Sequence, residues 1–281
     1  MFLWELFMSI TNQIFNQLSS SLAKGSPENP ETLNNALRLL SKWRHLLLQN
    51  TLIKNNGLVV LEGPFKGLKF LSKSLEGCYV PKLLGCYEQP LHKTIETVIQ
   101  TKYDVVLNIG SAEGYYAAGL AKSMPQTLIK AFDLNEAVKE PIAQLLRSNA
   151  ITNCVYSNNE FLSEHFNTYQ NKKTLVFCDI EGEERNLLDP LAAPSLLNMD
   201  IIAEAHDCFD KTISSELVKR FSNSHAIEII YDNGDRTLEN APDWFRNLGH
   251  LDQLLSFWEW RSGPTPWIVM KSKRANLMFK N

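Results

Sequence analysis

The stretch VVLNIGSAEGYYAAGLA, residues 105–121, decides the fold of this chain. It begins as an apolar run typical of a buried strand, breaks at a loop of small residues, and resumes with helix formers. A strand that turns sharply into a helix leaves backbone N–H groups free at the positive end of the helix dipole. The stretch therefore predicts a strand, a ligand-binding loop and a helix in succession.

Six further apolar runs follow this one at intervals long enough for helices. Continuous apolar runs, in contrast to alternating ones, are typical of a parallel sheet that helices cover on both faces. We therefore expect a doubly wound, mostly parallel, Rossmann-like α/β sheet whose ligands bind beyond the carboxyl ends of the strands. The seven predicted strands are DVVLNIG (104–110), TLIKAFD (127–133), NCVYS (153–157), TLVFCDIEG (174–182), MDIIAEAHD (199–207), AIEIIYD (226–232) and PWIVMKS (266–272).

The N-terminal part has a different pattern. Its first apolar stripe recurs at helical spacing and, after the break GSPENPE, a second helix begins near Pro30. GLVVLEGPFKGLKFLS (57–72) predicts a β-hairpin, and PLHKTIETVIQTK (90–102) a helix. We expect residues 1–98 to form a cap or dimerisation segment, and residues 99–281 to form the main domain. The first stripe comprises Leu3, Phe7, Ile10, Ile14 and Leu18.

Composition excludes several classes of protein. The net charge of the 281 residues is −3 and Lys and Arg form no long run, so a nucleic-acid partner is not expected. The apolar N-terminus lacks a basic region before it and carries Glu5, so it predicts neither a signal peptide nor a membrane span. The five cysteines are scattered without a CxxC pair, which favours the cytoplasm over a disulfide framework or a zinc site.

The loop after the first strand fits none of three common motifs. A P-loop needs Gly-Lys-Ser/Thr, a dinucleotide fingerprint needs glycines where Ala112 and Tyr115 stand, and a nucleophile elbow needs GxSxG. What remains is G-x-x-x-G, from Gly110 to Gly114, with Asp133 ending the second strand. A carboxylate there has two acceptor oxygens for the two hydroxyls of an adenosine ribose. The alternative is a glycine turn that serves only the strand-to-helix geometry.

With these residues the chain resembles the class I S-adenosylmethionine-dependent methyltransferases, whose first motif has the form D-I-G-C-G-E-G-Y-Y. Asn108 stands in place of the usual acidic residue and Ala112 in place of the middle glycine. The resemblance implies that the loop lines the methionine end of the cofactor and that Asp133 holds its ribose. It further implies that Asn159 and Glu160 lie near the adenine, the alternative being a solvated turn. The implied cofactor-binding residues are Asn108, Gly110, Ser111, Ala112, Glu113, Gly114, Asp133, Asn159 and Asp179.

A narrower resemblance rests on LVFCDIEGEERNLL (175–188), which is similar to the D-V-E-G-x-E signature of FkbM-type methyltransferases. LLGCYEQPL (83–91) resembles the segment that precedes their fold, and the likeness covers roughly residues 60 to 272. The family implies O-methylation of sugars and secondary metabolites. The first 55 residues have no counterpart in it.

Candidate catalytic residues close the fourth and fifth strands, whose tips converge near the sulfonium in the methyltransferase strand order. His206 would act as a general base oriented by a carboxylate, since its ordinary pKa is about 6.5. Alternatively, Asp179, His206 and Asp207 would bind Mg²⁺ or Mn²⁺ and lower the pKa of an acceptor hydroxyl. Glu181 lies two residues beyond Asp179. The plainer alternatives are that Asp179 caps the helix at EERNLL and that His206 is a satisfied strand-end histidine.

An insertion near residues 232–265 precedes the last strand and contains FWEWRSGPTPW. We expect a substrate lid here, with Trp258, Trp260 and Trp267 stacking on a sugar or aromatic acceptor and Arg261 meeting an anion, although ordinary packing suits most of the tryptophans. The sequence thus predicts a cytoplasmic S-adenosylmethionine-dependent O-methyltransferase of a small hydroxylated metabolite in secondary metabolism, with a glycoside as one candidate acceptor. A homodimer through the N-terminal helices is also expected. The rivals are an N-methyltransferase of an amine or peptide, and a non-catalytic cofactor-binding protein.

Overall fold

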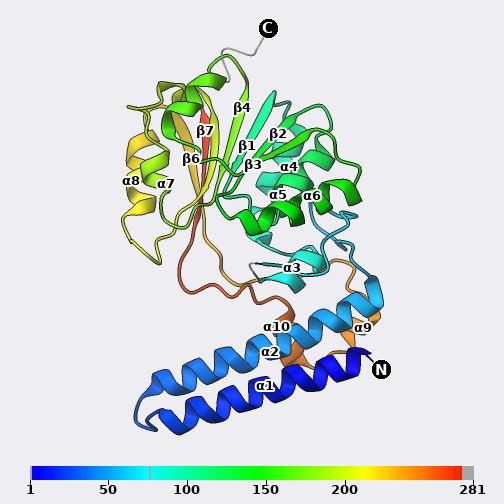
Figure 1. Ribbon diagram of the computed structural model, residues 1–281. Coiled ribbons are helices and arrows are strands. Elements are labelled where there is room, and N and C mark those ends of the chain that lie inside the picture. Colours follow the sequence, from blue (N-terminus) through cyan, green and yellow to red (C-terminus); the bar gives the residue numbers. More distant parts are fainter. Residues whose placement is uncertain (1, 76, 274–281) are drawn as a thin grey trace. The chain divides into compact units, whose positions relative to one another are not determined.

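A seven-stranded sheet forms the centre of the larger part of the chain (Figure 1), and the computed structural model describes residues 2–75 and 77–273. The strand order is β3-β2-β1-β4-β5-β7-β6. Neighbouring strands from β1 to β5 pair in parallel, whereas β7 runs antiparallel to both β5 and β6. This arrangement confirms the predicted doubly wound, mostly parallel, Rossmann-like sheet, with one strand in each predicted run. The strands are β1 (Val105–Ile109), β2 (Leu128–Phe132), β3 (Cys154–Ser157), β4 (Thr174–Cys178), β5 (Asp200–Glu204), β6 (His225–Ile230) and β7 (Trp267–Ser272).

The register of the central strands brings their carboxyl ends to one edge. Ile109, the last residue of β1, pairs with Phe132 of β2 on one side and with Cys178 of β4 on the other. Both β1 and β4 are buried along their whole length, as continuous apolar runs predict. The residues that follow these strands, among them Gly110 and Asp133, therefore emerge side by side at this edge.

Helices cover both faces of the sheet. Figure 1 shows α4, α5 and α6 together on one side, and α7 and α8 on the other. The α5 helix begins after Gly114, and the chain leaves it just before Pro125. The helices of this part are α3 (Tyr79–Leu84), α4 (His92–Gln100), α5 (Tyr115–Ser123), α6 (Lys139–Ser148), α7 (Glu184–Leu187) and α8 (Ile213–Phe221), with 3₁₀ turns at Gln89–Leu91, Glu136–Val138, Ser163–Tyr169 and Pro194–Asn198.

The chain divides into two compact units. The helical unit comprises Met1–Gly57 and Asn240–Trp258, and the sheet unit comprises Leu58–Glu239 and Glu259–Asn281. The N-terminal boundary thus falls near residue 57, in contrast to the predicted boundary at residue 98, because residues 58–98 cluster with the sheet. The helices of the helical unit are α1 (Phe2–Lys24), α2 (Pro30–Asn56), α9 (Asp243–Arg246) and α10 (His250–Ser256).

The two long helices form a hairpin, as the sequence predicts. Pro30 occupies the first turn of α2, and the Asn29 side chain caps that helix by accepting a hydrogen bond from the Glu31 backbone N–H. On α1, Ile14 and Leu18 are half-buried, and Thr11 on the same face accepts a hydrogen bond from the Trp43 indole of α2. This part of the predicted stripe therefore packs within the chain. The side chains of Leu3 and Phe7 lie outside the described part.

The middle of the predicted lid belongs to the helical unit. Arg44 of α2 holds Asp252 of α10 through two hydrogen bonds, and the His45 ring donates from Nδ1 to the Leu255 carbonyl oxygen at 3.2 Å. Burial lowers the pKa of His45 to about 4, so its ring is neutral at physiological pH. Residues 240–258 are thus part of a helical bundle, which corrects the expectation of a simple substrate lid.

Two further structural findings concern the expected elements. The predicted β-hairpin at residues 57–72 is reduced to a single antiparallel bridge between Val59 and Lys69. Gly63 and Gly67 both have positive φ in this segment, so the chain turns repeatedly instead of forming a ladder. Among the helices that the structure describes, none combines the length and apolar character that crossing a bilayer requires.

Candidate active site

The loop after β1 makes a sharp turn before α5 begins. Gly110 and Gly114 have φ values of +77° and +93°, and Ala112 between them has a φ of +47°. A Cβ atom at position 110 would overlap the Asp179 backbone carbonyl, so the close approach of β1 and β4 at their ends requires glycine there. The turn is stabilised by Asp133, whose Oδ2 accepts a hydrogen bond of 2.7 Å from the Ala112 backbone N–H.

A cavity of about 570 Å³ opens at this edge of the sheet, within the size range typical of ligand pockets. It lies where the strand order reverses between β1 and β4, the usual ligand position in doubly wound sheets. Its apolar wall includes Phe132 and Phe161, whose ring centroids are 4.8 Å apart. Other wall residues follow the adjacent strands β3, β2, β1 and β4: Gly110, Ala112, Asp133, Leu134, Asn159, Glu160, Leu162, Asp179, Ile180 and Glu181.

The structure brings most of the predicted cofactor residues to this cavity. Gly110, Ala112, Asp133, Asn159 and Asp179 line it, and so does Glu160. The remaining predicted cofactor residues, Asn108, Ser111, Glu113 and Gly114, do not line the cavity. Asn108 is buried inside the sheet on β1, where β2 and β4 enclose it. Within the described part of the chain, its Oδ1 atom and the Ser111 hydroxyl are buried without a hydrogen-bond partner.

Glu113 points away from the cavity. Its carboxylate forms a 2.7 Å ion pair with Lys82 of α3 and accepts a 2.6 Å hydrogen bond from the Ser74 hydroxyl. Both members of the pair are almost completely buried, and the Lys82 ammonium also lies over the Tyr87 ring. Burial raises the pKa of Glu113, but the charge and hydrogen bond of Lys82 outweigh this and lower it. Glu113 therefore holds the loop in place and, contrary to expectation, does not contact the cavity.

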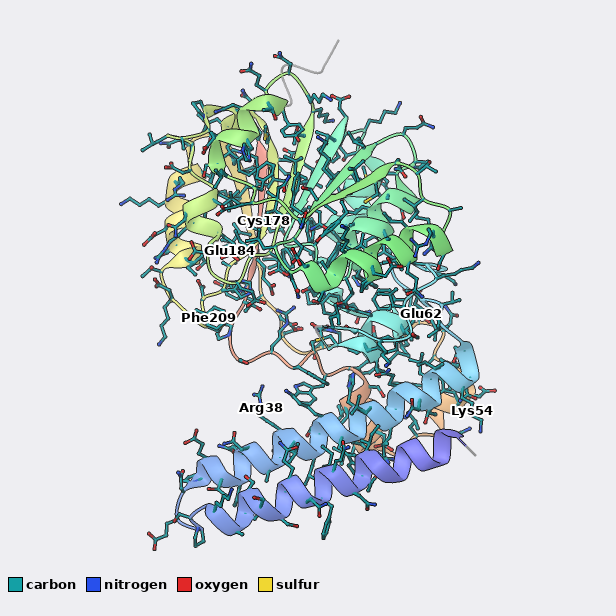
Figure 2. All side chains as sticks on the ribbon, viewed as in Figure 1. Arg38, Lys54, Glu62, Cys178, Glu184 and Phe209 are labelled. Atoms are coloured by element: carbon teal, nitrogen blue, oxygen red, sulfur yellow. The ribbon has the colours of Figure 1, made fainter. Side chains whose placement is uncertain are left out.

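His206 follows β5 and lies beside the cavity residues of β4. Its Nδ1 is 2.9 Å from the Oε1 atom of Glu184, a buried carboxylate on α7, and its ring stacks on Phe209. Figure 2 labels Glu184 and Phe209, which come from separate segments of the sheet unit. Because an ionised carboxylate only accepts hydrogen bonds, Nδ1 carries the proton and Nε2 is the atom left for chemistry. This is the carboxylate-oriented histidine that the sequence predicts, but with Glu184 as its partner.

Two carboxylates of the cavity face the other ring nitrogen. His206 Nε2 lies 3.6 Å from Asp179 Oδ1 and 3.4 Å from Glu181 Oε2. Glu204 at the end of β5 is a third neighbour, at 3.8 Å. Burial lowers the pKa of His206, but the hydrogen bond that its ring donates to Glu184 and the negative charges of Glu204 and Glu181 outweigh it, so the net shift is upward.

Asp207 does not join this cluster, which corrects the predicted metal-binding set. Its carboxylate accepts hydrogen bonds from both the backbone N–H and the hydroxyl of Ser214, near the start of α8. Asp179, Glu181 and His206 instead offer ligand atoms that all lie within 4.8 Å of one another. Asp179 is not a helix cap either, because α7 begins after Glu183 without a side-chain cap.

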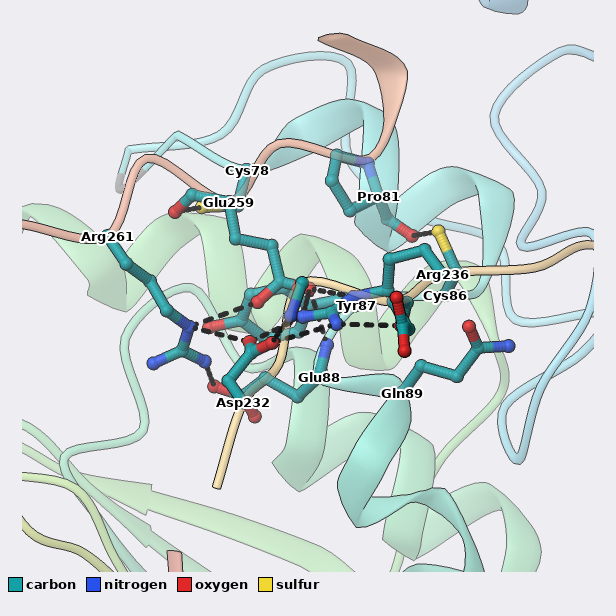
Figure 3. A network of polar contacts seen from close by, with 12 residues as sticks. Cys78, Pro81, Cys86, Tyr87, Glu88, Gln89, Asp232, Arg236, Glu259 and Arg261 are labelled. Atoms are coloured by element: carbon teal, nitrogen blue, oxygen red, sulfur yellow. Dashed lines mark hydrogen bonds and ion pairs between the residues drawn. The ribbon is translucent and has the colours of Figure 1, made fainter. Parts of the chain in front are cut away.

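Arg261 lies in an internal network of charges, shown in Figure 3. It forms ion pairs with Glu88 at 2.9 Å, with Asp232 at 3.2 Å and with Glu204. A second arginine, Arg236, pairs with Asp232 and with Glu259 at 2.6 Å. These carboxylates already satisfy the Arg261 guanidinium, which makes it unsuited to the predicted role of meeting an anionic acceptor.

The tryptophans of the predicted lid are likewise structural. Trp267 is the first residue of β7 and is buried against Phe177 and Tyr116, with ring centroids 5.0 and 6.3 Å away. Trp260 packs on Gly77, where a Cβ atom would lie 2.7 Å from its ring. Trp258 belongs to the helical unit. The predicted stacking platform is therefore replaced, for at least two of these rings, by packing within the sheet unit.

Sequence reasoning missed Glu184 and most of the apolar wall. Glu184 belongs to the run EGEE, in which no feature of spacing distinguishes it from Glu181 or Glu183. Only the position of α7 beside the end of β5 brings its carboxylate to His206. The wall residues Phe132 and Phe161 were hidden among many similar apolar positions.

Several solved structures of similar fold are described as methylases or methyltransferases. An rRNA methylase from Streptococcus thermophilus is 13% identical, with a TM-score of 0.43, over 64% of this chain and 94% of that one. A ribosomal protein L11 methylase from Lactobacillus delbrueckii subsp. bulgaricus is 15% identical, with a TM-score of 0.42, over 66% and 78% of the two chains. A precorrin-6y C5,15-methyltransferase from Geobacter metallireducens GS-15 is 13% identical, with a TM-score of 0.41, over 64% and 89%. No protein-family profile and no curated protein sequence matches the chain.

Proposed function

We propose that this chain is an S-adenosylmethionine-dependent methyltransferase that methylates a hydroxyl group of a small acceptor. One observation carries the proposal: the glycine loop, Asp133 and Asp179 face a single cavity, and the His206–Glu184 pair adjoins its far side. This arrangement supports a nucleoside site and a proton acceptor side by side at the carboxyl edge of the sheet.

The cavity suits the cofactor in shape and in polarity. Both oxygens of Asp133 already accept backbone hydrogen bonds, from Ala112 and Asn135, which fixes the carboxylate in position. Each oxygen has a second lone-pair direction, so Asp133 can still accept hydrogen bonds from two ribose hydroxyls. The Phe132 and Phe161 rings form an apolar wall for the adenine, and the turn at Gly110 lies on the side towards β4. When bound, S-adenosylmethionine supplies an electrophilic methyl group on a sulfonium.

The protein's chemical contribution is to position the acceptor and to remove its proton. Methyl transfer is an in-line displacement, in which the carbon–sulfur bond breaks as the carbon–oxygen bond forms and the hydroxyl loses its proton. His206 Nε2 is suited to take this proton, since Glu184 fixes the tautomer through Nδ1. Glu184 also stabilises the imidazolium that results. Asp179 and Glu181 then flank the acceptor and interact with the charge on His206.

A variant of the same reaction uses a divalent cation. Asp179, Glu181 and His206 form a set of two carboxylates and one imidazole with ligand atoms within 4.8 Å of one another. The Glu184 contact fits this version too, because a metal-binding histidine usually donates its other N–H to a carboxylate. These residues would hold Mg²⁺ or Mn²⁺, which would lower the pKa of the acceptor hydroxyl.

The similarity of residues 175–188 to FkbM-type methyltransferases favours a glycosidic or other hydroxylated metabolite as the acceptor. A carboxylate-lined site at the cavity edge also suits an amine, so an N-methyltransferase of an amine or peptide is the alternative. A protein that binds the cofactor without catalysis is a further alternative, because Asn108 and Ala112 depart from the common motif.

Two experiments test the proposal. Isothermal titration calorimetry should detect binding of both S-adenosylmethionine and S-adenosylhomocysteine at micromolar affinity. Absence of binding by either nucleoside would refute the proposal. Incubation with methyl-labelled cofactor and matched panels of hydroxylated glycosides and amines should then label a hydroxyl. Label found only on nitrogen would favour the N-methyltransferase, and binding without transfer to any panel member would favour the non-catalytic protein.

A further inference from the structure

The helical unit exposes an apolar stripe that its own helices leave uncovered. On α2, Leu33 and Leu37 are 63% and 64% exposed, and Leu40 is also exposed. On α1, Phe15 is 67% exposed and Leu22 follows it two turns later. Single exposed leucines are ordinary on protein surfaces, but large contiguous apolar patches usually mark an interaction site.

Helix geometry places these five side chains on one face of the hairpin. At 100° per residue, Phe15 and Leu22 lie about 80° to 100° around α1 from Ile14, which faces α2. Leu33, Leu37 and Leu40 lie about 40° to 100° in the same sense around α2 from the buried Ala36. Because the two helices run in opposite directions, the same sense of rotation turns both sets to the same side. We call this set, Phe15, Leu22, Leu33, Leu37 and Leu40, the hairpin stripe.

Two further exposed leucines lie in the helical unit, on α10. The Arg44–Asp252 hydrogen bonds, one of them 2.6 Å long, hold α10 beside α2 one turn beyond Leu40. These leucines, Leu251 and Leu254, come one residue before and two residues after Asp252. The arginine and the aspartate neutralise each other, so they place no net charge at this end of the stripe.

The face that carries the stripe has the size of a weak protein interface. Residues 10–24 of α1 and 30–44 of α2, up to the point where α10 meets α2 at Arg44, form a surface about 20 Å long, and two helices side by side are about 20 Å wide. This part of the hairpin therefore offers about 400 Å² from each copy, or about 800 Å² in total. Burying the stripe would add a second layer over the part of the hairpin that α10 leaves uncovered.

The borders of the stripe favour a protein over a membrane surface. Amphipathic helices that bind membranes carry Lys and Arg along the polar border of the apolar face. At the corresponding positions, about 140° to 160° around each helix, α2 has Asn34 and Ser41, and α1 has Asn12 and Ser19. Uncharged borders produce no repulsion when the same face meets itself, as a two-fold symmetric interface requires.

We propose that the hairpin stripe packs against the same stripe of a second copy of this chain, so that two hairpins form a four-helix bundle. In a two-fold arrangement with the axis near Leu37, the antiparallel α2 helices place Leu33 of one copy opposite Leu40 of the other. This inference concerns the helical unit and is independent of the proposed methyl transfer.

Sedimentation velocity of the full chain across micromolar concentrations tests the proposal. The unmodified protein should be a dimer. The double substitution Leu33→Glu with Leu37→Glu should raise the dimer dissociation constant by about 100-fold or more, because the interface would bury unpaired carboxylates. The matched control is Leu191→Glu in the sheet unit, at a leucine that is 92% exposed outside the stripe, and it should remain a dimer.

A second variant keeps the test decisive if the double substitution fails to fold. Under mild oxidation, Leu37→Cys should form a covalent dimer through position 37, whereas Leu191→Cys should not. A monomeric unmodified protein, or a folded Glu double variant that still dimerises, would overturn the proposal. A monomer that sediments with anionic phospholipid vesicles would assign the stripe to a membrane surface instead.

Discussion

Replacement of Asp133 is the sharpest test of the cofactor site. The carboxylate ends β2 at the wall of the cavity, and its two oxygens are held by the backbone N–H groups of Ala112 and Asn135. Asp133→Ala removes the acceptor of both ribose hydroxyls. Hydrogen bonds to a charged group contribute about 1.5–3 kcal/mol, and water compensates part of the loss, so we expect about 2–3 kcal/mol in total. This corresponds to a dissociation constant for S-adenosylhomocysteine that rises about 30- to 150-fold.

Calorimetric titration measures this change directly, provided that the variant is folded. The matched control is Asp104→Ala, since Asp104 also accepts a backbone hydrogen bond, from Lys173, but precedes β1 at the opposite edge of the sheet. This variant should bind the nucleoside as the unmodified protein does. An Asp133→Ala protein with an intact circular dichroism spectrum and unchanged affinity would remove Asp133 from the site. Equal weakening by both substitutions would show that the effect comes from general destabilisation.

Four further predictions concern the catalytic edge and the loop. Substitution of His206 by Ala should lower turnover by about 10²- to 10⁴-fold with nearly unchanged cofactor affinity. Glu184→Gln should also lower turnover. Full activity of His206→Ala would exclude both the general-base mechanism and the metal-assisted one. Chelation should abolish turnover and Mg²⁺ or Mn²⁺ restore it if a cation acts, whereas a chelator without effect would leave His206 as the base. The pKa of His206 is raised in the folded protein, so the stability that its charged form provides is present below about pH 6.5 and is lost as the pH rises through the folded pKa. The urea midpoint of His206→Gln should therefore fall further below that of the unmodified protein at acidic pH than at alkaline pH. A difference that stays constant with pH would count against the ion pair. Lys82→Met should destabilise the protein by about 3–5 kcal/mol, because Glu113 is left buried without its partner. The double substitution Lys82→Met with Glu113→Gln should recover part of this loss in the same urea titration. No recovery would show that the pair does not stabilise the loop.

The sequence was sufficient for the sheet because each strand carries its own signal. Runs such as VVLNI and TLVFC are buried along their full length, and their spacing leaves room only for helical crossovers. The topology then fixed the cavity, since residues that close neighbouring parallel strands must share an edge. Gly110, Asp133 and Asp179 were predicted for this reason, and they line one cavity in the structure.

Side-chain direction within the site was beyond the sequence. Glu113 stands in the middle of the loop, but it points to Lys82 because a buried lysine on α3 needs a carboxylate. Asp207 adjoins His206 in sequence, yet its carboxylate turns to Ser214. These directions depend on partners far along the chain, which neither spacing nor residue type reveals.

The insertion before β7 was misjudged for a related physical reason. Its tryptophans and Arg261 resemble a ligand platform in composition. Asp252 instead meets Arg44, which lies 208 residues earlier in the chain, and Arg261 meets Glu88. Contacts of such long range decide whether a segment is a lid or part of a helical bundle, and a local pattern does not encode them.

A crystal structure with S-adenosylhomocysteine bound tests the central claim most directly. We predict that the nucleoside occupies the cavity at the ends of β1, β2 and β4, with both ribose hydroxyls on Asp133 and the sulfur on the side of Asp179 and His206. An empty cavity at saturating ligand, or a nucleoside bound elsewhere on the chain, would contradict it.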